Sequence, residues 1–300
     1  MSTAKLISST TDLGQMLAKL NTSPTVPPHL YIDLEGVSLS RHGSVSILTL
    51  YDRSTPTNVY LIDVHTLGAL AFTTPAAAGE CPKSNDKTCE YDMANLDVEM
   101  EDVDNPPVVT LHSILESDSI PKVFFDVRND SDALFAHFGI KLQGIIDLQL
   151  MELATRGGSG RFSDPLHRRD HVNGLAKCIQ YGAGLSFENR KQVQVIKDRG
   201  TNLFAPERGG SYIVFNLRPL HPDLVRYCVQ DVVHMPALWN TYNNKMKKIQ
   251  FWGWVVSMET MKRIEESWSA NYVPQGKHKS IGWSWEYLLR LESLWNGARS

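Results

Sequence analysis

The spacing of apolar residues changes along the chain from strand-like to helix-like. Runs rich in aliphatic and aromatic residues predict strands at 30–35, 44–51, 58–64, 121–125 and 145–148. Apolar positions three and four residues apart predict helices at 11–20, 109–115, 129–138, 148–156, 172–184, 187–197 and 222–247, with two more in 252–300. The first three strands predict a β-meander, and the later alternation of strand and helix predicts an α/β fold.

The first predicted strand carries two acids. In Leu30-Tyr31-Ile32-Asp33-Leu34-Glu35-Gly36 the side chains of Asp33 and Glu35 are two residues apart, so both point to one face while Leu34 points to the other. Two adjacent carboxylates repel each other, and oxygen ligands on a rigid element suit Mg²⁺ or Mn²⁺. The alternative is that both acids lie on the solvated face of an edge strand.

The charge of the chain is unevenly distributed. The formal net charge is -3 over 300 residues, yet the stretch 80–104 holds nine acids and two lysines, a local charge of -7 that leaves +4 for the remainder. A mildly basic remainder permits a polyanionic partner without requiring one. The stretch lacks periodicity, so we predict a disordered acidic insertion at about 74–107, which could mask a groove or recruit a protein.

The cysteines and the hydropathy indicate an intracellular protein. The four cysteines (Cys81, Cys89, Cys178 and Cys228) show neither a CxxC pair nor zinc-site spacing, which fits a reducing compartment. No run approaches 18 apolar residues, and the first 20 residues lack a basic region followed by an apolar run. We therefore expect no membrane association, while nucleus and cytosol stay equally open. The predicted organisation is an N-terminal helix and linker (1–27), a main domain (28–247) and a helical C-terminal extension (248–300).

Further acids follow in the second half of the chain. Asp130 stands where the strand predicted at 121–125 gives way to a helix, a place where any carboxylate is stabilised by the helix dipole. Tyr227 and Asp231 are four residues apart on the helix predicted at 222–247, so they share one face. Without other evidence, that pair is equally explained as a side-chain hydrogen bond on a half-buried helix.

Taken together, these positions resemble the DEDDy branch of the DnaQ-like 3'-5' exonucleases. The five motif residues occur in the family's order: Asp33, Glu35, Asp130, Tyr227 and Asp231. Flanking strings such as IIDLQLMEL and NLRPLHPDLVRYCVQD are most similar to the ribonuclease D, Werner-type and Egalitarian-type subgroup. The resemblance covers about 28–247 and implies a ribonuclease H-like mixed sheet flanked by helices. The histidine variant of the family carries His five residues before the last acid, where this chain has Arg226.

The resemblance implies a site with two divalent cations, Mg²⁺ or Mn²⁺. Asp33 would bridge both ions, Glu35 and Asp231 would complete one, and Asp130 would reach the other. Tyr227 would orient the attacking water, because a phenol with a pKa of about 10 is a poor base at neutral pH. Asp126 and Asp132 compete with Asp130, and the family pattern after Lys122-Val123 selects Asp130. The implied activity releases nucleoside 5'-monophosphates from a nucleic acid with a free 3' end.

Several residues beside these motifs are candidates for substrate binding: Gly36, Arg41, Arg128, Asn129 and Arg169. The alternative for the charged ones is a solvated loop. The ribonuclease D-like flanking strings favour RNA over DNA as substrate, by resemblance alone. For the tryptophans of the C-terminal extension, helical context favours core packing over base stacking. Two other functions stay open: a nucleic-acid-binding adaptor with little or no turnover, and a structural protein without a nucleic-acid partner.

Overall fold

The computed structural model of the chain describes residues 3–23, 26–55, 58–78, 108–156 and 169–297. The predicted acidic insertion at about 74–107 lies almost wholly outside the described residues, as do Cys81 and Cys89. No helix in the described ranges is both long and apolar enough to span a bilayer.

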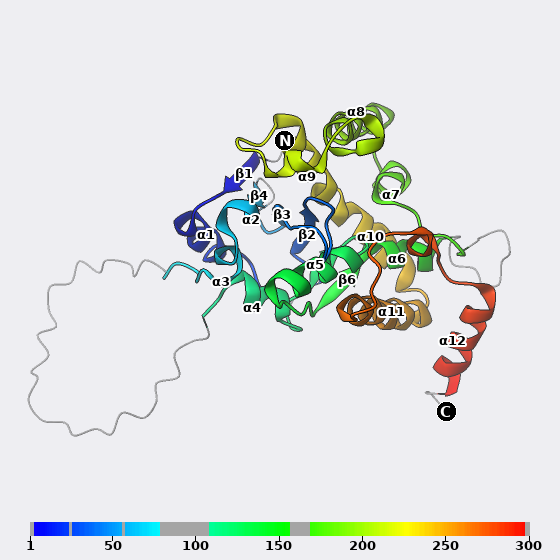
Figure 1. Ribbon diagram of the computed structural model, residues 1–300. Coiled ribbons are helices and arrows are strands. Elements are labelled where there is room, and N and C mark those ends of the chain that lie inside the picture. The colour runs from blue at the N-terminus through cyan, green and yellow to red at the C-terminus, as the bar shows by residue number, and fades with distance from the viewer. Residues whose placement is uncertain (1–2, 24–25, 56–57, 79–107, 157–168, 298–300) are drawn as a thin grey trace, which may run out of the picture.

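A six-stranded mixed sheet runs through the middle of the molecule (Figure 1). Its strands are β1 (Thr3–Ile7), β2 (Leu30–Glu35), β3 (Ile47–Asp52), β4 (Asn58–Ile62), β5 (Lys122–Phe124) and β6 (Ile145–Asp147). The spatial order is β1-β4-β3-β2-β5-β6, in which β2, β3 and β4 pair antiparallel and the other three pairings are parallel. The predicted β-meander and the ribonuclease H-like α/β class are therefore confirmed.

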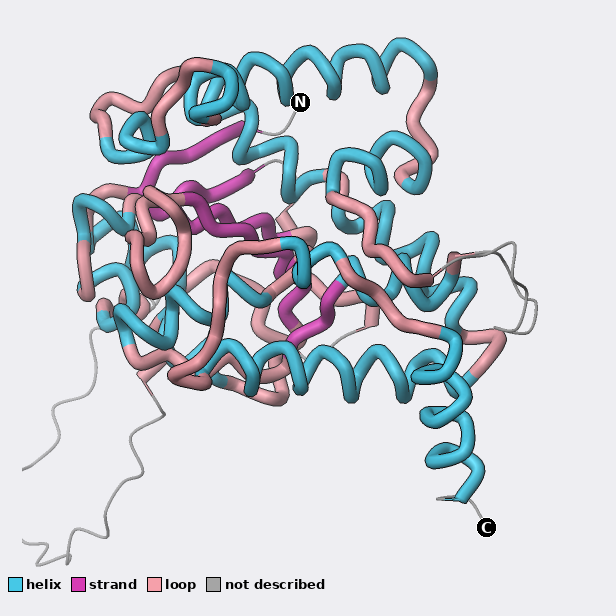
Figure 2. Tube along the Cα trace, turned by 45° about the vertical axis from the view of Figure 1, so that its right-hand side comes forward, coloured by secondary structure: helices cyan, strands magenta, loops and turns pink. Residues whose placement is uncertain are grey.

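Helices cover both faces of the sheet, as the tube in Figure 2 shows. The first half contributes α1 (Thr10–Leu17), α2 (Val64–Leu67), α3 (Leu70–Thr73), α4 (Leu111–Glu116), α5 (Arg128–Phe138) and α6 (Leu148–Thr155). The second half contributes α7 (Leu175–Gly182), α8 (Phe187–Phe204), α9 (Pro222–Val233), α10 (Met235–Met246), α11 (Gln250–Trp268) and α12 (Trp285–Gly297). Short 3₁₀ helices in the described residues are η1 (Pro206–Arg208), η2 (Tyr212–Asn216) and η3 (Lys277–Ser280).

The alternation along β2 separates two apolar cores. Leu30, Ile32 and Leu34 pack with the first part of the chain on one face of the sheet. Tyr31 belongs to the core on the other face, where α9 packs against β2 and β3. Because side chains alternate along a strand, Asp33 and Glu35 point to the same side as Tyr31 and so face α9.

Several elements differ from the prediction: α2 and α3 were not predicted, and α8 continues to Phe204, beyond the predicted end at 197. β1 was not predicted, since it is a short strand at the sheet edge whose pattern is weak, and it pairs in parallel with β4. The prediction of a single helix at 222–247 is wrong, because the segment is divided at His234 into α9 and α10. Pro236 explains the break: a proline has no backbone N–H to donate and its ring disfavours a continuous helix.

The C-terminal extension packs onto the main domain. α11 lies along α5, α6 and β6, whereas α12 projects away from the body (Figure 1). Trp252 and Trp283 are buried, with nearly parallel rings whose centroids are 6.0 Å apart. Core packing is thus confirmed for these two tryptophans, although Trp285 is 43% exposed. The thiols of Cys178 and Cys228 are free and buried, as apolar packing of these residues predicts.

Candidate active site

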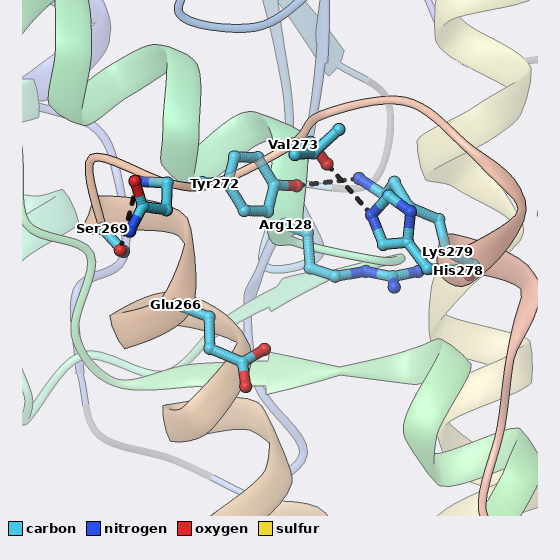
Figure 3. Close-up of a pocket in the computed structure, with 8 residues that line it drawn as sticks. Arg128, Glu266, Ser269, Tyr272, Val273, His278 and Lys279 are labelled. Atoms are coloured by element: carbon cyan, nitrogen blue, oxygen red, sulfur yellow. Dashed lines mark hydrogen bonds between the residues drawn. The ribbon is translucent and has the colours of Figure 1, made fainter.

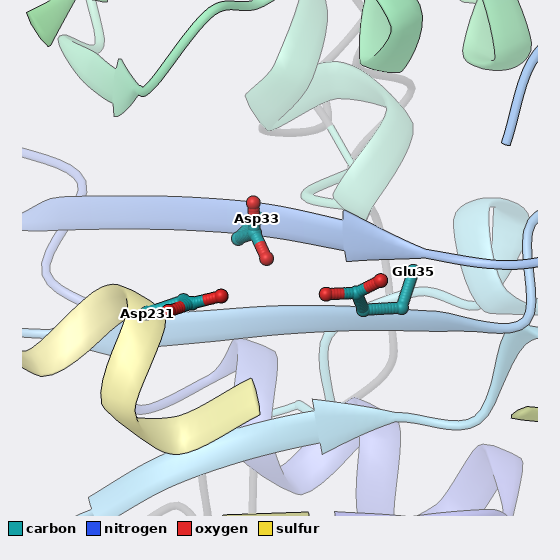
Figure 4. A group of neighbouring side chains, drawn as sticks. All are labelled: Asp33, Glu35 and Asp231. Atoms are coloured by element: carbon teal, nitrogen blue, oxygen red, sulfur yellow. The ribbon is translucent and has the colours of Figure 1, made fainter. Parts of the chain in front are cut away.

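Three carboxylates from two elements converge beside the central strand. Asp33 and Glu35 lie on β2, Asp231 reaches them from α9, and one oxygen of each lies within 4.8 Å of the others (Figure 4). Asp33 and Glu35 are half-buried, and Asp231 is buried. The packing of α9 on β2 therefore brings together acids almost 200 residues apart in the chain.

The start of α9 fixes the direction of that helix. Pro222 occupies its first turn, and the His221 side chain accepts a hydrogen bond from the backbone N–H of Asp223. One turn apart on its buried face lie Tyr227 and Asp231. A hydrogen bond from the Tyr227 hydroxyl helps to lower the pKa of Asp231, while burial raises it more strongly.

Asp130 approaches the cluster from the first turn of α5. Its Oδ1 accepts a hydrogen bond of 3.2 Å from the backbone N–H of Leu34, the residue between Asp33 and Glu35. The carboxylate is buried, and burial raises its pKa to about 8 even though this hydrogen bond opposes the shift. The fourth acid thus lies against β2, at the edge of the other three.

The two competing acids are held in ion pairs with arginine. Asp126 accepts hydrogen bonds from Arg128 at 2.5 and 2.7 Å, and Asp132 accepts one of 2.6 Å from Nε of Arg41. A carboxylate that is already neutralised by a guanidinium is a poor candidate for a cation ligand. This geometry supports the choice of Asp130 made from the sequence.

Burial and mutual repulsion destabilise the charged form of the clustered carboxylates. Burial is the main cause that raises the pKa of Asp33 and of Glu35 well above their usual values, and the neighbouring acids raise both further. Oδ1 of Asp231 is buried without a hydrogen-bond partner among the described residues. Oxygen-only donors at this separation, with an unsatisfied buried carboxylate, fit a hard divalent cation.

Lys197 is a site residue that the sequence reading missed. Its charge lowers the pKa values of Asp33, Glu35 and Asp231, and its Nζ lies 5.3 Å from the centroid of the Tyr227 ring. The residue comes from α8, which packs against α9. No local pattern links a lysine of one helix to acids of another, so only the packing of α8 identifies it.

Gly200 on the same helix makes room for Tyr227. A Cβ placed on Gly200 would lie 2.7 Å from Cβ of Tyr227, closer than two carbon atoms normally approach. The Tyr227 ring is also packed edge-on against the ring of Phe204 at 5.2 Å. The helix predicted at 187–197 ends before Gly200, whereas α8 continues to Phe204, so the sequence reading gave no signal for this close packing.

The residues predicted to contact phosphates are held by other parts of the protein. Arg41 also donates to the carbonyl oxygens of Ser267 and Ala270, at 2.7 and 3.2 Å. Arg128 donates to the carbonyl oxygen of Lys279 at 2.8 Å, and Asn129 accepts from the Tyr272 hydroxyl. All three side chains therefore contact the chain at or beyond the end of α11.

The other two candidates have structural partners of their own. Arg169 is buried, donates to the carbonyl oxygens of Leu153 and Arg156, and stacks over the Trp252 ring at 4.8 Å. A Cβ placed on Gly36 would lie 1.9 Å from the carbonyl oxygen of Ser44, so the turn after β2 requires glycine there. Substrate binding by these five residues remains a prediction.

Comparison with known proteins gives one family and one fold. A family model described as 3'-5' exonuclease matches residues 81–247, a range that includes Asp130, Tyr227 and Asp231 but begins after β2. A search of curated proteins finds no significant match. Among solved structures, ribonuclease D of Trypanosoma brucei in complex with RNA U12 is similar, with 17% identity and a TM-score of 0.64 over 97% of this chain and 79% of that one.

Two further structures share the fold. The catalytic core of RRP6 from Trypanosoma brucei has 13% identity and a TM-score of 0.55, over 88% of this chain and 52% of that one. Ribonuclease D of Escherichia coli has 15% identity and a TM-score of 0.50, over 89% of this chain and 51% of that one. The resemblance derived from the five motif residues is thereby confirmed. The chain therefore belongs to the 3'-5' exonuclease family, and it shares its fold with ribonuclease D.

Proposed function

We propose that this exonuclease hydrolyses phosphodiester bonds at the 3' end of RNA with the help of two divalent cations, Mg²⁺ or Mn²⁺, and releases nucleoside 5'-monophosphates. The observation that carries the proposal is the convergence of Asp33, Glu35 and Asp231, whose oxygens lie within 4.8 Å of one another. Asp130 at the N-terminus of α5 would supply the fourth carboxylate.

The four carboxylates would hold the cations. When bound, two such ions activate water, neutralise charge on the phosphate and stabilise the leaving 3'-oxygen. The carboxylates would hold the ions at fixed positions, because β2 and α9 are rigid elements packed against each other. Oδ1 of Asp231, which is buried and has no hydrogen-bond partner in the described part of the chain, would gain a partner from such an ion.

Tyr227 would orient the attacking water. Burial, followed by the charge of Asp231, raises the pKa of Tyr227 well above its usual value, so the phenol keeps its proton at neutral pH. A protonated phenol can donate a hydrogen bond to an oxygen in the site but cannot act as its base. The Tyr227 ring packs against Phe204 and lies close to Gly200, which has no side chain in the way. This packing fixes the direction of the hydrogen bond.

RNA is the substrate that we favour. The Trypanosoma brucei ribonuclease D that shares this fold was solved with RNA U12, and the flanking strings of this chain resemble the same subgroup. Preference for RNA over DNA requires contacts to the 2'-hydroxyl. The proposal therefore predicts slower cleavage of a DNA strand of the same sequence.

The test is a time course on 5'-labelled single-stranded RNA and DNA, with Mg²⁺, with Mn²⁺ and with chelator. The wild-type enzyme should give a metal-dependent ladder that shortens from the 3' end. Asp33→Asn should abolish the ladder, while Asp198→Asn, the same chemical change at an exposed position of α8, should leave it intact. Binding without any ladder in either metal would refute the proposal and leave the nucleic-acid-binding adaptor.

A further inference from the structure

The segment that follows α11 crosses the N-terminus of α5. We call residues 269–281 the strap. Its Tyr272 hydroxyl donates to Oδ1 of Asn129 at 2.8 Å, and the carbonyl oxygen of Lys279 accepts from Arg128 at 2.8 Å. The ammonium of Lys279 also donates to Oδ1 of Asn129. The strap thus lies on the two residues that directly precede Asp130.

A pocket of about 400 Å³ opens between the strap, α5 and the end of α11 (Figure 3). Its walls combine cationic and apolar groups with one carboxylate, that of Glu266. Among the lining residues are Arg128, Lys279, His278, Tyr272, Val273 and Glu266. In the close-up, the Tyr272 ring and the Arg128 side chain border the same space. A volume of this size suits a small polar ligand or one unit of a larger one.

The charges around the pocket do not balance. Asp126 is paired with Arg128, and Asp147 is paired with Arg263 at 2.7 Å. In contrast, the ammonium of Lys279 donates only to neutral oxygens of Asn129 and Tyr272, and no carboxylate in the described residues lies within 4 Å of it. Glu266, the carboxylate that lines the pocket, is paired with Lys262 at 4.0 Å. Among the described residues, Lys279 is therefore the cation of this group that has no ion pair.

Lys279 is also partly shielded from water. Burial lowers its pKa to about 8, although Asp126 counters part of the shift, so the ammonium is still mostly charged at neutral pH. A shielded cation that lacks an anionic partner is costly for the protein. An anion in the pocket would remove that cost, and the N-terminus of α5 would favour it further.

The position of the pocket identifies the anion. Arg128 and Asn129, which contact the strap, directly precede Asp130 in α5, and the charge of Lys279 is close enough to Asp130 to act on its carboxylate. A nucleic acid strand carries a phosphate at every nucleotide, together with bases that can pack against an aromatic ring. A strand whose 3' end lies at the cluster would have its next phosphates within reach of this part of α5.

We propose that the strap pocket binds a backbone phosphate of the substrate strand, with Lys279 and Arg128 as the cationic contacts and Tyr272 beside the adjoining sugar or base. The inference rests on the proposed exonuclease function, because it takes the 3' end to lie at Asp33, Glu35 and Asp231. It assigns a role in substrate binding to the C-terminal extension, which carries no catalytic acid.

The experiment measures binding of a fluorescein-labelled oligouridylate by anisotropy over a range of salt concentrations. The protein carries Asp33→Asn and the buffer contains chelator, so that the oligonucleotide stays intact. Adding Lys279→Met should raise Kd roughly tenfold at low salt, as expected for one charged hydrogen-bond contact. It should also reduce the slope of log K against log salt by about 0.7, the value for one phosphate of a single strand.

Matched variants separate phosphate binding from simple anchoring of the strap. Lys277→Met removes the same charge from an exposed position on the strap and should change neither Kd nor slope. Tyr272→Phe removes the hydroxyl that bonds Asn129 and Lys279 but keeps the ammonium, so the slope should persist. Lys279→Arg should restore the slope.

Two results would overturn the inference. In the first, the slope of log K against log salt is the same for Lys279→Met as for Lys277→Met. In the second, Lys279→Met and Tyr272→Phe reduce this slope equally, which would show that Lys279 only anchors the strap. A wild-type cleavage time course on the same oligonucleotide runs in parallel. If the wild type cleaves the oligonucleotide but Lys279→Met leaves the salt slope unchanged, the inference about the pocket is wrong and the proposed exonuclease function is not. If the wild type does not cleave it but Lys279→Met reduces the salt slope, phosphate binding by the pocket is supported and the proposed exonuclease function is not.

Discussion

Replacing Arg263 by Met should loosen the C-terminal extension from the main domain. Arg263 lies on α11 and donates to Oδ2 of Asp147 at 2.7 Å, where the side chains are 10% and 0% exposed. It also lies 3.6 Å from Asp126. Asp147 in turn accepts from the backbone N–H groups of Asp126 and Gln149, so it holds the loop that leads into α5.

The size of the effect follows from the burial of the pair. Removing one partner of a buried ion pair costs about 3 to 5 kcal/mol, because a charge is left without compensation. Asp147 keeps its backbone donors, so we take the lower end, about 3 kcal/mol. For a protein of this size that corresponds to a fall in Tm of roughly 6 to 12 °C.

The assay is urea unfolding followed by tryptophan fluorescence. The control is Lys262→Met on the same helix, whose pair with Glu266 spans 4.0 Å between side chains that are 51% and 60% exposed. Exposed pairs contribute about 0 to 1 kcal/mol, so this variant should unfold almost like the wild type. The double variant Arg263→Met with Asp147→Asn should lose less than the sum of the single losses. Equal stability of Arg263→Met and Lys262→Met would refute the reasoning.

Three further predictions concern the acidic cluster. Gly200→Ala should displace Tyr227, so kcat should fall at least tenfold while urea unfolding shows a loss of about 1 to 3 kcal/mol. Tyr227→Phe should lower kcat on the order of 10²-fold, with the Kd for oligonucleotide unchanged, because only the orienting hydroxyl is lost. In chelator, the raised pKa values of Asp33 and Glu35 mean that the folded protein binds more protons than the unfolded chain above about pH 4, so its Tm should fall as pH rises toward 8. Mg²⁺ at ten times its Kd should add about 1.4 kcal/mol to the free energy of unfolding, or roughly 3 to 6 °C to the Tm. Glu35→Gln should flatten the pH dependence of the Tm in chelator. A Tm that responds neither to pH nor to Mg²⁺ would contradict this prediction.

The parts of the site that follow from local periodicity were predictable from the sequence. Two-residue spacing on β2 puts Asp33 and Glu35 on one face, and four-residue spacing on α9 does the same for Tyr227 and Asp231. Their convergence was not derivable from spacing and came from the family resemblance. The structure gives the physical reason, which is the packing of α9 on β2 and β3.

The parts that depend on long-range packing were not predictable. Lys197 reaches the cluster only because α8 packs on α9. The partners of Arg128 and Asn129 lie 151 and 143 residues further along the chain, in the strap, and no local pattern indicates them. β1 was missed for a related reason. A five-residue strand at the sheet edge has few buried positions, so its apolar pattern is weak, and its partner β4 comes some fifty residues later.

The most direct test of the account is to identify the products made from an unlabelled RNA by mass spectrometry. The wild-type enzyme with Mg²⁺ should yield nucleoside 5'-monophosphates together with intermediates that have lost nucleotides only from the 3' end, and Asp33→Asn should yield neither. Nucleoside 3'-monophosphates, fragments from internal cuts, or equal turnover by Asp33→Asn would contradict it.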